Sequence, residues 1–179
     1  MYRVAPAVLT FLIVWGVQTC RAAEPAAPAA AKPELTRGAT SIDQLLDAFL
    51  AAVQAKDEQA LTQLRVDHRE YRDIIIPGTV KPGQPPRNVP DETAEFFWSM
   101  INQKSLDVGY ALLKNFGGHK YTRKEVSYTK GTREFGWYKA HGDVRLELVD
   151  EQGAVRELHT GAIAEVDGHY KFIGFNSNN

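Results

Sequence analysis

Cysteine is almost absent from this sequence of 179 residues, in which Cys20 is the only one. A single thiol forms no disulfide within the chain, and it cannot build a thiolate metal site. If Cys20 belongs to a segment that is removed, the mature chain also has no cysteine nucleophile. Stability must then come from a packed core, for which a chain of this length is sufficient.

An excess of charge of one sign is missing as well. The 21 Lys and Arg residues stand against 22 Asp and Glu residues, which gives a net charge of −1. Binding to nucleic acid usually depends on a dominant basic surface. The sequence therefore predicts no nucleic-acid partner, and it predicts a solvated surface on which both signs are mixed.

The apolar run at residues 8–17 is shorter than the roughly 20 residues that a transmembrane helix needs. Arg3 precedes this run, and Ala22 and Ala23 follow it, which is the order of charge, apolar segment and small residues in a secretory signal peptide. We predict that residues 1–23 are a signal peptide and that the protein is exported, to the periplasm or as a secreted protein. An uncleaved membrane anchor is the alternative.

Cys20 ends this apolar segment, at the place where a bacterial lipoprotein carries its lipidated cysteine. The residue before it is Thr19, whereas the lipoprotein pattern prefers Gly, Ala or Ser there. Two interpretations stay open: Cys20 is discarded with the signal peptide, or it carries a lipid anchor. In both cases the membrane is contacted only through the signal peptide or through Cys20.

Residues 24–40 start as a run of alanine and proline, which cannot form a core and is typical of a semi-extended linker. We therefore place the folded domain at residues 41–176. Ser41 is expected to cap a helix whose apolar stripe runs from Ile42 to Val53, and Asp57 to cap a second, short helix.

Residues 67–73 are dense in charge and are expected to continue as a helix with a solvated face and an ion pair between Arg69 and Asp73. The segment 77–90 contains five prolines and two glycines, so we expect a stiff loop there.

Pro90 and the acidic pair that follows it predict the start of another helical region, 91–116. We expect two helical segments, the second from Ser105, and a stop at Gly117–Gly118. The residues expected to face inward in the first segment are Phe96, Phe97, Met100 and Ile101.

From Tyr121 onward apolar residues alternate, which predicts strands at 121–128 and 135–148. Residues 150–153 form a turn, and the register that we prefer places Leu148 opposite Val155 and Glu147 opposite Arg156. Asp167–Gly168 predicts a type I′ hairpin, because both central residues of that turn need a positive φ. In this hairpin Ile163 pairs with Phe172, and Glu165 with Tyr170.

Helices followed by an antiparallel meander indicate an α+β fold. The run Phe49–Asp57 and the closing run Val166–Ile173 resemble the first helix pair and the last hairpin of nuclear transport factor 2-like (SnoaL-like) domains. The resemblance implies N-terminal helices packed on a strongly curved antiparallel sheet, a cone-like half-barrel, with a pocket between the sheet and the helices. It spans roughly residues 42–175 and does not select an activity.

The preferred register places Glu157, His159 and Tyr170 on one sheet face, as polar groups among apolar walls. We predict that these three residues bind a ligand, and no catalytic residue is predicted. The alternative is that they lie at the rim of the sheet and pair with Arg145, Arg156 or Lys171. No phosphate-binding loop, dinucleotide fingerprint or metal-ligand spacing is present, so we expect no cofactor and no metal.

Three functions remain open from the sequence. The favoured one is a non-enzymatic domain of the cell envelope that binds a small apolar ligand or a partner protein. The second is an isomerase- or dehydratase-type enzyme that uses the pocket. The third is a homodimeric assembly domain that pairs through the outer face of the sheet, with Trp98, Trp137 or the proline loop at the contact.

Overall fold

The computed structural model describes residues 34–176. The predicted signal peptide with Cys20, and the alanine–proline run up to residue 33, lie outside the described residues. The last part of the predicted linker belongs to the fold, because Leu35 is buried and the backbone of Ala39 exchanges two hydrogen bonds with that of Tyr170.

The described chain is α+β, with all helices preceding all strands. The helices are α1 (Ile42–Ala55), α2 (Glu58–Gln63), α3 (His68–Glu70), the π-helical turn η1 (Tyr71–Ile75), α4 (Ile76–Gly78) and α5 (Asp91–Phe116). The strands are β1 (Tyr121–Tyr128), β2 (Thr132–Glu134), β3 (Lys139–His141), β4 (Val144–Asp150), β5 (Val155–His159), β6 (Ile163–Val166) and β7 (His169–Phe172).

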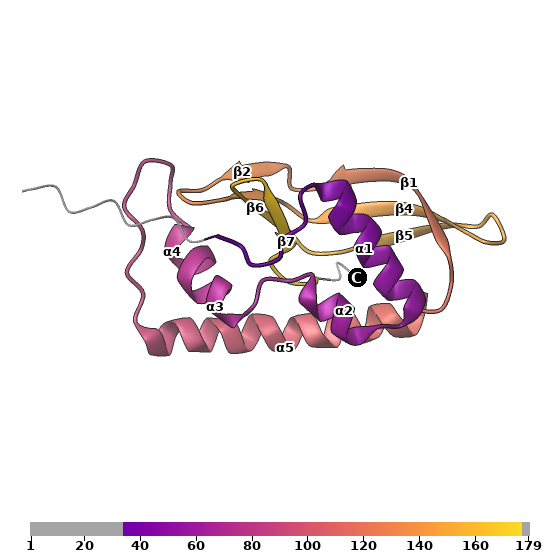
Figure 1. Cartoon of the computed structure of the whole chain (residues 1–179), viewed down its shortest axis with the longest axis horizontal. Coiled ribbons are helices and arrows are strands. Elements are labelled where there is room, and N and C mark those ends of the chain that lie inside the picture. The colour runs from indigo at the N-terminus through magenta and orange to yellow at the C-terminus, as the bar shows by residue number, and fades with distance from the viewer. Residues whose placement is uncertain (1–33, 177–179) are drawn as a thin grey trace, which may run out of the picture. The chain divides into compact units, whose positions relative to one another are not determined.

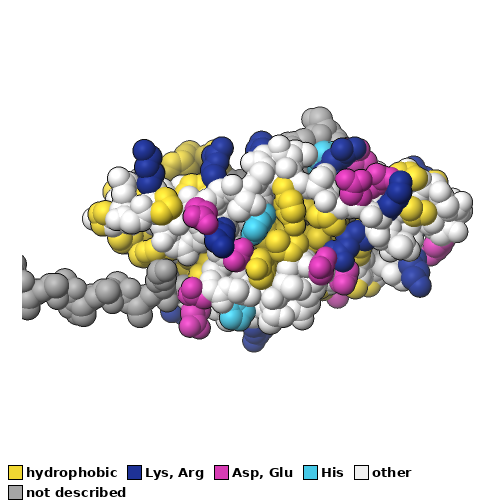
Figure 2. All heavy atoms as spheres, turned by 90° about the horizontal axis from the view of Figure 1, so that it is seen from above, with side chains coloured by type: hydrophobic (Ala, Val, Ile, Leu, Met, Phe, Trp, Pro, Cys, Tyr) yellow, Lys and Arg dark blue, Asp and Glu magenta, His cyan; other side chains and the backbone are white. Residues whose placement is uncertain are grey.

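The strands form two antiparallel sheets, in the orders β1-β4-β5 and β2-β3-β6-β7. Neither sheet closes into a barrel within residues 34–176. Figure 1 shows the sheets on one side of this domain, α5 on the opposite side, and α1 and α2 between them. On the face seen in Figure 2, basic and acidic side chains alternate around a band of hydrophobic side chains.

The predicted helix pair and its caps are confirmed. The Ser41 hydroxyl accepts a hydrogen bond from the backbone of Gln44 at 3.0 Å, and the Asp57 carboxylate accepts one from Ala60 at 2.9 Å. The inner face of α1 then packs against the strands. Within this core the rings of Phe49, Phe172 and Phe175 contact one another, with centroids 5.3 to 5.9 Å apart.

The predicted hairpin is also confirmed, in its register as well as its position. Ile163 pairs with Phe172 and Glu165 with Tyr170. The turn residues Asp167 and Gly168 have φ values of 46° and 78°, as a type I′ turn requires.

The prediction for residues 91–116 is wrong in two respects. They form one continuous helix, and Phe96, Phe97 and Met100 are exposed by 60%, 45% and 56%. The buried residues of α5 are instead Ala94, Ser105, Val108, Gly109 and Leu112. Ser105 accepts a hydrogen bond from the backbone of Phe175 at 2.9 Å, and Gly109 is buried at the contact with α2. Val108 and Leu112 on the same side belong to the main core, and these contacts hold that side inward.

The predicted single strand 135–148 is wrong as well. Residues 135–138 are a turn that joins β2 to β3, and the chain turns again at Gly142–Asp143, where Asp143 has a φ of 41°. This corner carries the chain from one sheet to the other, because β3 pairs with β6 whereas β4 pairs with β1 and β5.

The register predicted for β4 and β5 is wrong by one residue, since Glu147 lies opposite Glu157. Asp150 is the physical reason. Its carboxylate accepts backbone hydrogen bonds from Gln152 and Ala154, which closes a tighter turn. These bonds lower the pKa of Asp150, and the bond from Ala154 has the larger effect. The facing carboxylates are compensated because Lys124 contacts Glu147 and Arg145 contacts Glu157.

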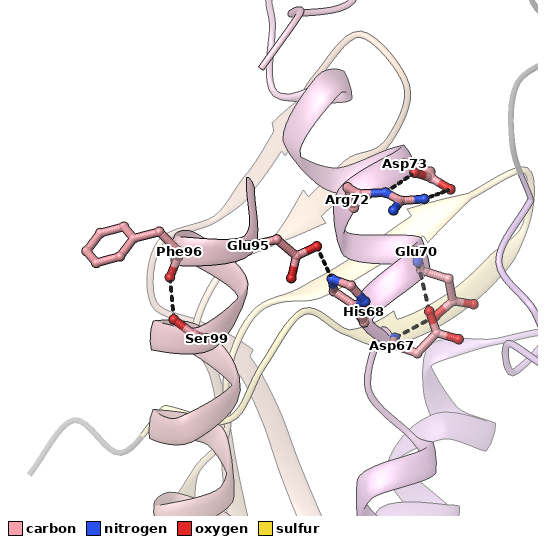
Figure 3. A network of polar contacts seen from close by, with 8 residues as sticks. All are labelled: Asp67, His68, Glu70, Arg72, Asp73, Glu95, Phe96 and Ser99. Carbon is pink, nitrogen blue, oxygen red and sulfur yellow. Dashed lines mark hydrogen bonds and ion pairs between the residues drawn. The ribbon is translucent and has the colours of Figure 1, made fainter. Parts of the chain in front are cut away.

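The helix at residues 67–73 forms as predicted, but its face is not uniformly solvated. Arg69 lies 3.7 Å from Asp73 as an i,i+4 pair, and Arg72 contacts the same carboxylate more closely, at 2.7 Å. Glu70 is buried, and its carboxylate accepts a hydrogen bond from the backbone of Asp67 (Figure 3). Helix α4 extends the helical region to Gly78, so the proline-rich loop starts two residues later than predicted.

Candidate functional site

A groove with a volume of about 520 Å³ lies between α5 and the edge strand β5. The C-terminal half of α5 supplies one wall, with the apolar side chains of Val108, Leu112 and Phe116. Residues 156–159 of β5 supply the other wall, and the turn that follows β4 closes one end. The groove thus has an apolar side on the helix and a polar side on the strand.

Two of the three predicted site residues, Glu157 and His159, line this groove together. Nε2 of His159 lies 2.6 Å from a carboxylate oxygen of Glu157, and Arg145 contacts the other oxygen. Leu158 between them faces the core opposite Leu146, so Glu157 and His159 lie on the other face of the sheet. The register shift of one residue has therefore reversed the face that the sequence predicted.

Tyr170, the third predicted residue, lies elsewhere. It belongs to β7 in the four-stranded sheet, whereas β5 belongs to the three-stranded one. Its ring centroid is 6.3 Å from that of His141, and His141 contacts Glu165 at 2.9 Å. The prediction that Tyr170 shares one sheet face with Glu157 and His159 is wrong, because the chain changes sheets between β5 and β6.

The side chain of His159 has an unusual hydrogen-bonding state. Its Nδ1 atom is buried and has no hydrogen-bond partner within residues 34–176. A carboxylate only accepts hydrogen bonds, so the contact with Glu157 places a proton on Nε2. In the neutral imidazole Nδ1 is then an acceptor. Leaving such an atom unsatisfied costs about 1–3 kcal/mol.

The helical wall of the groove and the position of His119 in its lining were not predicted from the sequence. The Gly117–Gly118 stop does place His119 just beyond the end of α5, where its ring lies 6.4 Å from that of Tyr121. Nothing in the local pattern indicates that β5 passes beside this point. That juxtaposition depends on the order of strands in the sheet, which the sequence did not give us.

Glu157 has a pKa below its ordinary value, because its carboxylate is hydrogen-bonded by Arg145 and, secondarily, by His159. A carboxyl group with a lowered pKa stabilises the fold above its ordinary pKa, and that contribution is lost as the pH falls through the lowered value. We expect Arg145→Gln to raise the pKa of Glu157 toward its ordinary value. An NMR titration of the side-chain carboxyl carbon measures this shift.

The matched control is Arg156→Gln, because Arg156 is the arginine next to Glu157 on β5 and pairs with Asp150 instead, at 3.4 Å. That variant should leave the pKa of Glu157 close to its value in the unmodified protein. An unchanged titration in Arg145→Gln would show that the Arg145 contact does not determine the charge state of the groove.

Within residues 34–176, no group of three or more His, Cys, Asp and Glu side chains is arranged to bind a metal ion. None of the helices in that range is long and apolar enough to cross a membrane. Comparison with protein-family models, with curated proteins and with solved structures returns no match to this chain.

Proposed function

We propose that this protein is an exported, non-enzymatic binding domain that holds a small ligand with an apolar body in the groove between α5 and β5. The groove itself carries the proposal. Its volume of about 520 Å³ lies within the roughly 300–1,000 Å³ of small-molecule sites, and it sets an apolar wall on α5 against a polar wall on β5. Glu157 and His159, which line the groove and contact each other, are the groups that orient the polar end of the ligand.

The proposal also includes membership of the nuclear transport factor 2-like superfamily. In support of it, the helix pair and the last hairpin that carry the resemblance both form as that family would require. In this view the two sheets together correspond to the curved half-barrel of the family. Export through residues 1–23 rests on the sequence pattern alone.

An enzyme of the isomerase or dehydratase type is the second candidate, because a histidine held by a carboxylate is a common general base. Two observations weigh against it. Arg145 already neutralises Glu157, and the Glu157 side chain is 45% exposed, so the pair is neither isolated from water nor free to take up charge. A binding role demands less of the same residues.

Native mass spectrometry on protein purified gently from an exporting host tests the proposal. We expect a non-covalently bound mass that is lost on denaturation. Asn115→Trp places a large ring in the groove from an exposed position on α5, so the bound fraction should fall several-fold. The control is Gln54→Trp, at an exposed position on α1 that does not line the groove, which should retain the ligand.

A bound mass that survives Asn115→Trp unchanged would place the ligand elsewhere. Protein that carries no bound mass, and whose thermal stability no compound in a metabolite screen raises, would overturn the proposal.

A further inference from the structure

Helix α5 concentrates the exposed hydrophobic surface of the domain. Among residues 34–176 there are six large hydrophobic side chains that are exposed, and five of them lie on this one helix. They are Phe96 (60%), Phe97 (45%), Met100 (56%), Leu106 (37%) and Tyr110 (68%). Single exposed apolar residues need no explanation, but a contiguous set on one element usually marks an interaction site.

Three of these side chains, Phe96, Leu106 and Tyr110, fall at the positions of a helix that packs against another helix. Phe96 and Tyr110 are two heptads apart with the polar Gln103 midway between them, and Leu106 lies one heptad after the polar Ser99. In Figure 1 the side of α5 away from the sheets is not covered by any other labelled element. Figure 3 shows the ring of Phe96 pointing away from α3 and its polar network. We call this surface the outer stripe of α5.

We propose that a second copy of this chain covers the outer stripe, so that two α5 helices pack antiparallel about a two-fold axis at Gln103. In that register Phe96 lies opposite Tyr110 of the second copy, and Met100 lies opposite Leu106. The N-terminal half of the stripe on each copy therefore packs against the C-terminal half of the stripe on the other copy, and this contact occurs twice. An interface in which one patch serves both partners is what two-fold symmetry requires.

The charges of α5 favour the same arrangement. Glu92 in its first turn and Lys114 in its last turn are both exposed, and the antiparallel register places them opposite each other. In a parallel pair, the two Glu92 side chains would lie beside each other, and so would the two Lys114 side chains. In the antiparallel arrangement the two helix dipoles also point in opposite directions, which is favourable.

A lipid surface is a poorer match for the outer stripe. Helices that lie on membranes carry Lys and Arg along the polar face, which attract anionic lipids. The charged residues of α5 are Asp91, Glu92, Glu95, Lys104, Asp107 and Lys114, four acidic and two basic. This inference is independent of the proposed ligand site. The sequence suggested the outer face of the sheet as the dimer contact, whereas this proposal places the contact on α5.

A single introduced cysteine tests the register, in protein that also carries Cys20→Ser so that no other thiol is present. Gln103→Cys places one cysteine on the proposed axis, where each copy meets its symmetry mate. We expect mild oxidation to convert most of this variant to a disulfide-linked dimer. The control is Lys114→Cys, also exposed on the outer stripe, whose two copies would lie 22 residues apart, or about 33 Å. It should stay largely uncrosslinked.

Light scattering on the unmodified chain completes the test. We expect a dimer mass at high micromolar concentration, and we expect Phe96→Asp to give a monomer with an unchanged circular dichroism spectrum, because this side chain is exposed and supports no core. Equal crosslinking of both cysteine variants would exclude the antiparallel register. A monomer at every concentration, whether or not it binds anionic lipid vesicles, would overturn the proposal.

Discussion

Replacing Lys171 with Met is expected to lower the free energy of unfolding by about 3–5 kcal/mol, the usual result of removing one partner from a buried ion pair. Both partners are inaccessible to water, because the side chains of Lys171 and Glu70 are 6% and 3% exposed. Methionine matches lysine in length and fills the same space. The loss therefore comes from the uncompensated carboxylate of Glu70 and not from a cavity.

Glu70 makes this effect large because it connects segments that are far apart in the sequence. Nζ of Lys171, on β7, lies 2.9 Å from both of its oxygens. The backbone of Thr36 donates to the same carboxylate at 2.6 Å, and that of Asp67 at 2.9 Å. Without Lys171 these two neutral donors are left to solvate a buried charge, which is insufficient.

The matched control is Lys139→Met, which removes a lysine from the same sheet. Lys139 is 47% exposed and lies 3.6 Å from Glu165, so its ion pair is screened by water and should contribute less than about 1 kcal/mol. Urea denaturation followed by circular dichroism measures both variants. Equal and small losses would show that the buried pair adds nothing beyond what a surface pair does.

The features that could be predicted from the sequence are those decided by neighbouring residues. The Asp167–Gly168 hairpin needs only two residues with positive φ between two β-rich runs, and its register follows from the length of the turn. The caps at Ser41 and Asp57 likewise act on backbone groups three residues away. In such cases the sequence contains both partners of the interaction within one short window.

The features that were missed depend on contacts between distant segments. The buried side of α5 is set by tertiary contacts, with Val108 and Leu112 in the main core and Ser105 bonded to the backbone of Phe175, so counting apolar residues along the helix selected the wrong face. Glu70 appears solvated in its own helix because its partner Lys171 is 101 positions away.

The candidate site shows the same division. Glu157 and His159 were identified correctly as neighbours because they lie two positions apart on one strand. Tyr170 was grouped with them only through an assumed continuous sheet, and the break between β5 and β6 separates it. The α5 wall of the groove is a tertiary contact, and no local pattern of the chain contains it.

The second substitution with a large expected effect lies in that break between β5 and β6. We expect Gly161→Ala to lower the free energy of unfolding by about 3 kcal/mol or more, as an overpacked and inflexible site does. Gly161 lies where the chain passes from one sheet to the other, and a Cβ atom built there would be 1.7 Å from the carbonyl oxygen of Gly174. The oxygen belongs to the backbone, and the backbone of residue 161 fixes the position of its Cβ atom, so no side-chain rotation can relieve the overlap.

Gly109→Ala is the matched control, since it adds the same methyl group at another buried glycine. Its Cβ would lie 3.6 Å from Leu61 and 3.8 Å from Phe175, at ordinary contact distances. Within a helix this change usually stabilises by about 0.5–1 kcal/mol, because alanine loses less conformational freedom than glycine. Opposite signs for the two variants in urea denaturation would show that Gly161 is required by the backbone crossing. A tolerated Gly161→Ala would mean that the segment between the two sheets shifts easily. The separation of Tyr170 from the groove would then depend on a flexible segment.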